Sequence, residues 1–144
     1  CYEYMFDGCT SLVTEPELPS TTLAPYCYSG MFQNCSALGF SPYLPATTLA
    51  DGCYFHMFNG CTSLIQASEL LATTLTEDCY VWMFHNCSSL NYIKAMFTDS
   101  PDLGYTTNWV QGVASTGTFV KNKDATWDVT GNDGIPEGWT VETA

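Results

Sequence analysis

Eight cysteines are the residues of this chain whose type and spacing most readily suggest chemistry. They form four pairs, and seven residues separate the two members of each pair. A disulfide within each pair would stabilise the fold by about 2.5 kcal/mol on the chain-entropy argument. Alternatively, the cysteines form two columns of buried thiols that act as small apolar filler. Metal binding fits poorly, because this spacing and the lack of an accompanying histidine pattern do not match known metal-ligand sets.

The strict pairing favours disulfides, as does an exported location in which thiols oxidise readily. We expect no metal and no other cofactor. The disulfide candidates are Cys1, Cys9, Cys27, Cys35, Cys53, Cys61, Cys79 and Cys87.

The other residues able to catalyse a reaction do not assemble into a site. His56 and His85 occupy different positions of the repeat described below, so they need not stack, and each is interpreted as a surface histidine. Glu17 and Glu69 share a repeat position, but Tyr43 intervenes, and a paired-carboxylate glycosidase also needs an enclosing pocket. The stretch 128–134 fails the spacing of an EF-hand loop, which favours a polar turn. We therefore expect no catalytic residues and no enzymatic activity.

The elements that would position these residues come from an internal repeat. Nearly the same phrase recurs every 26 residues as CYEYMFDGCTSL, CYSGMFQNCSAL, CYFHMFNGCTSL and CYVWMFHNCSSL, in copies spanning 1–26, 27–52, 53–78 and 79–104. A strict period of this length predicts a solenoid in which copies stack and equivalent side chains touch in columns. One predicted column is Phe6, Phe32, Phe58 and Phe84.

Each copy is expected to fold as one short strand and one short helix. The apolar positions that all copies share are spaced so that they lie on one side of a short helical turn. Gly8, Asn34, Gly60 and Asn86 suit a left-handed residue at the end of that helix. A proline-containing extended stretch and a Thr-rich connector follow. The sequence therefore predicts an α/β repeat solenoid.

The phrase CxxxMFxxCxSL, followed by LPxTTLA, resembles the leucine-rich repeats of BspA-like surface proteins of Bacteroidetes. The family core AF-x-GC-x-SL is matched by 5–12 and its three copies, although methionine replaces the usual alanine and Cys1 and its equivalents replace the usual isoleucine. The resemblance covers 1–104 and implies four leucine-rich repeats there, each with a strand and a helix.

Residues 105–144 are expected to form a small β-rich C-terminal cap. They resemble a segment that follows such repeats, and they contain short β-prone stretches separated by Gly, Asn and Asp turns. Trp109, Trp127 and Trp139 suit the apolar inner side that a terminal unit needs. Because the first copy begins without a cap, we expect further repeats or another domain upstream.

The charge balance is strongly acidic. Fifteen acidic residues face three lysines, for a net charge of −12, and every lysine lies beyond residue 93. Nucleic-acid binding and adsorption to anionic lipid both require positive charge, so neither is expected. No apolar run approaches the roughly 20 residues that cross a bilayer, so we expect no membrane insertion.

Positions that vary between copies are not dictated by stacking, and we expect them to be exposed. One varying row lies early in the phrase, and another lies in the extended stretch, where it should line the sheet face. Aromatic rings of the first row are suited to stack on a sugar ring or to anchor a protein partner, or they only cover neighbouring helices. The candidate binding surface is Glu15, Glu17, Ser41, Tyr43, Ala67, Glu69, Phe55, His56 and Trp82.

Together with the BspA-like resemblance, these expectations predict a noncatalytic recognition or adhesion module. It would be an extracellular monomer at the bacterial cell surface and would bind a host or bacterial surface protein or a glycan through its solenoid face. The alternative is a structural spacer with no ligand of its own.

Overall fold

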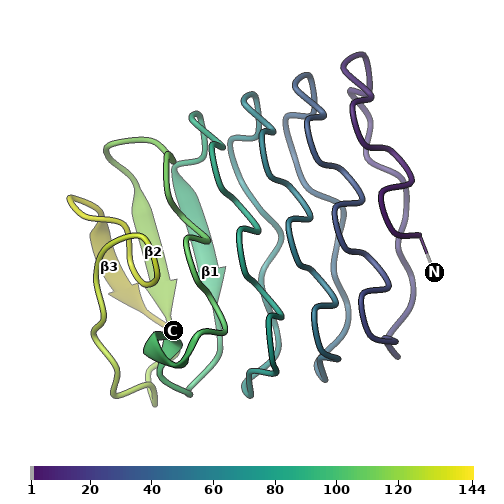
Figure 1. The fold of residues 1–144 in the computed structure, drawn as a ribbon. Coiled ribbons are helices and arrows are strands. Elements are labelled where there is room, and N and C mark those ends of the chain that lie inside the picture. Colours follow the sequence, from purple (N-terminus) through teal and green to yellow (C-terminus); the bar gives the residue numbers. More distant parts are fainter. Residues whose placement is uncertain (1) are drawn as a thin grey trace.

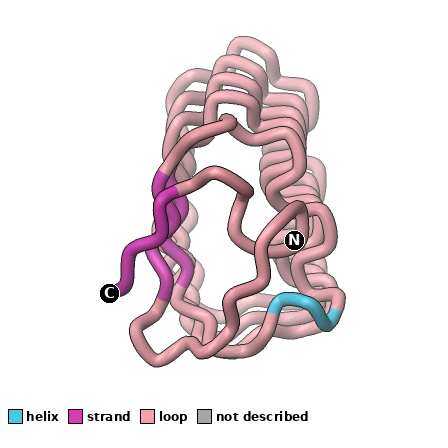
Figure 2. The backbone as a smooth tube through the Cα atoms, turned by 90° about the vertical axis from the view of Figure 1, so that its left-hand side faces the viewer, coloured by secondary structure: helices cyan, strands magenta, loops and turns pink. Residues whose placement is uncertain are grey.

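The computed structural model describes residues 2–144, which consist mostly of turns and irregular segments (Figure 1). The regular elements are β1 (Tyr92–Ala95), the 3-10 helix η1 (Pro101–Leu103), β2 (Thr118–Lys121) and β3 (Thr140–Thr143). The strands form one parallel sheet in the order β1-β2-β3, with Tyr92 opposite Thr118 and Thr118 opposite Thr140. Figure 2 shows the strands along one side of the molecule and η1 at the opposite lower corner.

The expected α/β leucine-rich repeat solenoid, with a strand and a helix in every copy, is wrong. Within residues 2–144 there is no α-helix, and η1 lies outside the expected helical stretches. Within the part of the chain that the structure describes, strands form only at β1, β2 and β3. The preceding copies contribute isolated bridges, such as those of Gln66 with Phe40 and with Tyr92. The observed fold is a small open parallel sheet preceded by copies without regular secondary structure.

Successive copies nevertheless lie side by side, because the backbone of one bonds to the next. We call the four copies coils 1 to 4, in chain order; Figure 1 shows them as neighbouring loops. The N–H groups of Tyr2, Tyr28 and Tyr54 donate to the carbonyls of Cys27, Cys53 and Cys79, one coil further along. The ladder continues past residue 104, where the Tyr80 N–H donates to the carbonyl of Tyr105.

The segment expected to be a helix is a run of overlapping turns, which we call the turn run: 2–9, 27–35, 53–61, 79–87 and the equivalent 105–112. Tyr26, immediately before coil 2, has a φ of 55°, and Gly30 and Asn34 within coil 2 have a φ of 59° each. A left-handed residue at every fourth position is incompatible with a right-handed helix. The N–H groups therefore alternate: that of Met31 donates three residues back, to Tyr28, and that of Gly30 donates to Phe55 of the next coil.

The predicted aromatic column is present and fills the core. The rings of Phe6, Phe32, Phe58 and Phe84 stack with centroid separations of 5.6, 5.5 and 5.9 Å and interplanar angles of 10° or less. A parallel column of tyrosines begins at Tyr2 and has separations of 6.1–6.2 Å. Such contacts add to the stabilisation from burial. The inner side of the turn run is therefore held by stacking between coils rather than by helical hydrogen bonds.

The C-terminal segment buries its three tryptophans, as predicted. The indole N–H of Trp109 donates to the Gly134 carbonyl at 2.9 Å, and that of Trp139 donates to Ala114 at 2.7 Å. Trp127 stacks on Phe97 with a centroid separation of 5.1 Å. The Trp127 indole N–H also donates to the Phe97 carbonyl. Each of the three buried rings thus has both apolar packing and a hydrogen-bond partner for its N–H group.

Candidate functional site

Large exposed apolar side chains gather on the extended segments of the first three coils. Val13, Phe40, Tyr43 and Ile65 are 66%, 55%, 65% and 45% exposed. An exposed apolar group of this kind is typical of an interaction surface, whereas single exposed residues are ordinary. We call this surface the extended face and define it by Val13, Glu15, Glu17, Phe40, Tyr43, Ile65 and Glu69.

The backbone of neighbouring segments holds the extended face in shape. The Ile65 N–H donates to the carbonyl of Gly39 at 2.9 Å, and Phe40 bridges to Gln66. Ser41 cross-links two coils, since its hydroxyl accepts the N–H of Ser68 at 2.6 Å. Ser41 thus ties the segments together and is only half-buried, so it contributes to the face mainly as a support.

A groove with an acidic wall lies at the N-terminal part of this face. Its cavity of about 450 Å³ is lined by Glu15, Glu17 and Tyr43, and by the prolines and the leucine that separate them. Glu15, Glu17 and Tyr43 are exposed. The three lysines are engaged elsewhere: Lys94 pairs with Glu69 at 3.2 Å, Lys121 donates to the Trp127 carbonyl, and Lys123 pairs with Asp124. No lysine therefore neutralises Glu15 or Glu17, and the groove keeps a negative charge.

The structure does not bring all the predicted surface residues together. Ala67 is buried, with 5% of its surface exposed, because its segment turns that position inward, as it does Ile93 in β1. A one-residue change of register moves a side chain to the other face of an extended segment. Val13, Phe40 and Ile65 are exposed and belong to the varying extended stretch, one or two positions before the candidates Glu15, Ser41 and Ala67.

The other predicted surface residues form a half-buried aromatic ladder on the turn runs. His56 stacks on Phe55 at 4.0 Å and on Trp82 at 5.1 Å between ring centroids. His85 stacks on Trp82 at 4.2 Å, and its Nδ1 lies 3.0 Å from the Asn59 side-chain oxygen. The two histidines are half-buried and not isolated at the surface, since each stacks on the Trp82 indole.

Burial lowers the pKa of both histidines, and for His56 the nearby His85 lowers it further. Both imidazoles are therefore favoured in the neutral form at neutral pH. The His56 ring packs between Phe55 and Trp82, and the His85 ring packs on Trp82, so the ladder mainly covers its own neighbours.

The turn runs and the extended segments face opposite sides of a shared core. Trp109 of the last turn run meets Phe119 of β2 edge-to-face at 6.2 Å, and both side chains are fully buried. Outward side chains of the two segments consequently point away from each other. The aromatic ladder and the extended face are therefore two separate surfaces.

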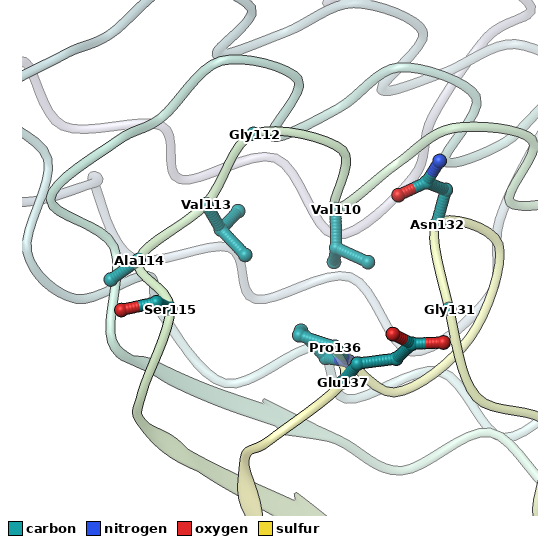
Figure 3. A pocket seen from close by; sticks show the side chains of 9 residues that line it. All are labelled: Val110, Gly112, Val113, Ala114, Ser115, Gly131, Asn132, Pro136 and Glu137. Atoms are coloured by element: carbon teal, nitrogen blue, oxygen red, sulfur yellow. The ribbon is translucent and has the colours of Figure 1, made fainter.

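A second concave region lies near the C-terminus (Figure 3). Its cavity of about 340 Å³ is lined by backbone and small side chains, with Val110, Val113 and Pro136 as its apolar groups. Glu137 is its only charged residue, and its lining contains no histidine or cysteine. Figure 3 shows Ser115 on one side and Asn132 on the other, with no nucleophile placed beside a base. General acid-base or nucleophilic catalysis needs such a pair.

Six of the seven described cysteines follow the buried-thiol arrangement in this structure, and Cys9 is exposed. Cys9, Cys27, Cys35, Cys53, Cys61, Cys79 and Cys87 are free thiols, and the disulfide candidates within each copy are not paired; Cys1 lies outside the described residues.

The thiols of the second column donate to the preceding coil, as the Cys61 thiol does to the Phe32 carbonyl at 3.0 Å. Cys53 interacts with Cys27 and Cys79 of the adjacent coils, and Cys61 with Cys35, so each copy places its two cysteines in separate columns. Burial raises the pKa of the Cys53 and Cys61 thiols from 9.0 to about 12. These thiols are unreactive core groups at neutral pH.

In residues 2–144 no three His, Cys, Asp or Glu side chains are grouped closely enough to hold a metal ion. No helix among them has the length and apolarity that crossing a bilayer requires. A scan against family models finds no match, and searches of curated proteins and of solved structures find no significant similarity. The resemblance to BspA-like proteins therefore stays a prediction from the quoted motifs.

Proposed function

We propose that this chain is a noncatalytic recognition module whose extended face binds a protein partner with a basic rim. The observation that carries the proposal is the group of four large exposed apolar side chains, Val13, Phe40, Tyr43 and Ile65, on one side of stacked coils. Aromatic side chains anchor protein interfaces by filling pockets on the partner. The aliphatic side chains of Val13 and Ile65 favour a protein partner over a glycan. A glycan is better bound by an aromatic platform with polar side chains beside it.

The charge of the chain specifies the partner further. The net charge is −12, and Glu15 and Glu17 border the groove without a lysine beside them. A surface of this sign attracts basic proteins and repels acidic ones, and the attraction is screened by salt. The proposed setting is the bacterial cell surface, with a host or bacterial surface protein as the partner, which rests on the BspA-like resemblance alone.

The test begins with binding of the whole chain to arrays of extracellular proteins and of glycans. The strongest saturable protein ligand is then measured with the double variant Phe40→Ser/Tyr43→Ser. We expect the Kd to rise about tenfold or more, with an unchanged melting temperature because both rings are exposed. Raising the ionic strength should weaken binding, since Glu15 and Glu17 contribute by long-range attraction.

Leu103→Ser is the matched control, because Leu103 is an equally exposed apolar residue, at 67%, that lies in η1 outside the extended face. It should leave the Kd unchanged. An equal loss of affinity for the double variant and for Leu103→Ser would contradict the assignment of the extended face as the binding surface. Saturable binding to glycans alone would replace the protein partner, and no saturable ligand on either array would favour the structural spacer.

A further inference from the structure

The N-terminal end of the stack exposes the core columns. Tyr2 and Met5 of coil 1 are 52% and 57% exposed, and Phe6 and Leu12 are only partly buried. The equivalents of Tyr2 and Met5 in the next coils are almost completely buried: Tyr28, Tyr54 and Tyr80 at 4% or less, and Met31, Met57 and Met83 at 2% or less. The end face thus shows in cross-section the apolar side chains that stacking covers everywhere else.

Hydrogen bonding gives this end face a direction. In coil 2, the carbonyls of Ser29, Met31 and Gln33 accept N–H groups from coil 1. The corresponding carbonyls of coil 1 belong to Glu3, Met5 and Asp7, and they accept no hydrogen bond from residues 2–144. A hollow of about 230 Å³ borders Tyr2, Met5 and Phe6, and a second hollow of about 180 Å³ borders Tyr2. The face therefore presents hydrogen-bond acceptors and apolar hollows, and no coil within residues 2–144 donates N–H groups to these acceptors.

The opposite end of the ladder is closed by the chain itself. The Asn108 N–H donates to the Asp133 carboxylate at 2.6 Å, and the Val110 N–H donates to the Asn132 carbonyl at 3.2 Å. The indole of Trp109 is also covered, by Gly134. A second copy of this chain therefore cannot supply the donor row by stacking its C-terminal end here. Two N-terminal end faces would bring acceptors against acceptors, so they do not match either.

We propose that this end face is a docking surface for one further coil of the same 26-residue phrase, stacked on the side of coil 1 that faces away from coil 2. Alternate N–H groups of that coil donate to the carbonyls of Glu3, Met5 and Asp7. Its tyrosine, methionine and phenylalanine continue the columns over Tyr2, Met5 and Phe6. This proposal does not depend on the function of the extended face, which the added coil would lengthen by one segment.

The test is to fuse a second copy of residues 53–78 directly in front of the chain. We expect the melting temperature to rise and the alternate amides of the added coil to be protected from hydrogen exchange. Met5 is the most exposed methionine among the described residues, and its oxidation by peroxide should slow about tenfold once it is covered. Met96, which is half-buried at the other end of the stack, should oxidise at an unchanged rate.

The matched control is the same fusion with serine at the two added positions that correspond to Met57 and Phe58. Its added coil should exchange freely and leave Met5 unprotected. Equal protection by both fusions, or none by either, would overturn the proposal. A dimer of the unfused chain at micromolar concentration that Met5→Ser dissolves would overturn it too, because a second copy would then be the occupant.

Discussion

Replacing Phe58 with alanine should lower the free energy of unfolding by about 3–5 kcal/mol, the usual cost of removing a buried phenylalanine. The Phe58 ring is fully buried and stacks on two neighbours, Phe32 at 5.5 Å and Phe84 at 5.9 Å. Truncation leaves a cavity that the coils on either side can fill only by breaking their ladder of hydrogen bonds. Urea denaturation monitored by circular dichroism measures the change.

Phe40→Ala is the control of the same chemistry, because Phe40 is 55% exposed on the extended face. It should change the free energy of unfolding by no more than about 0.5 kcal/mol. Phe6→Ala should fall between the two, since Phe6 is partly buried and stacks on one ring only. If Phe58→Ala and Phe40→Ala lowered the free energy of unfolding by similar amounts, the phenylalanine column would not form the core.

Raising the pH above 9 under reducing conditions should destabilise the fold steeply. Burial raises the pKa of Cys53 and Cys61 from 9.0 to about 12, and that of Cys35 and Cys79 to about 11. The unfolded chain loses these thiol protons first, so it binds fewer protons than the folded chain, and stability is lost as the pH rises through this window. Each thiol contributes a slope of about 1.4 kcal/mol per pH unit.

Urea titrations at pH 8, 9, 10 and 11 with a phosphine reductant measure that slope. Cys61→Ala is the matched variant, and its slope should be smaller by one thiol. Mass spectrometry without reductant should give the fully reduced mass. A mass lower by eight hydrogens would contradict the free thiols of the structure and support the disulfides expected from the spacing. In that case the stability should depend steeply on pH only after the reductant is added.

The repeat was sufficient to predict which residues form the core, but it was not sufficient to predict the backbone conformation. Identical letters at a fixed period require identical neighbours, so the phenylalanine column followed directly from the sequence. The spacing of the apolar positions fits a helical turn and also fits a run of overlapping turns. The difference lies in left-handed residues at every fourth position, and two of these are Tyr4 and Trp82, with φ of 52° and 58°. Bulky residues rarely adopt this conformation, so their types gave no warning of it.

The surface shows a similar division. Glu15, Glu17 and Tyr43 were predictable as exposed because they vary between copies, and the structure gathers them at one groove. Ala67 varies too, yet it is buried, because its segment turns that position inward, as it does Ile93 in β1. The contact of His56 and His85 with Trp82 crosses two coils, and only the stacking register brings the three rings together.

The most direct test of the account is detection of hydrogen-bond scalar couplings by NMR in the isotope-labelled chain. The stacked coils predict couplings from the amide nitrogens of Tyr28, Gly30 and Phe32 to the carbonyl carbons of Cys53, Phe55 and Met57, twenty-five residues further along. Couplings from the same nitrogens to carbonyls four residues earlier would show a helix in each copy. That result would contradict the ladder, the columns it supports and the surface they display.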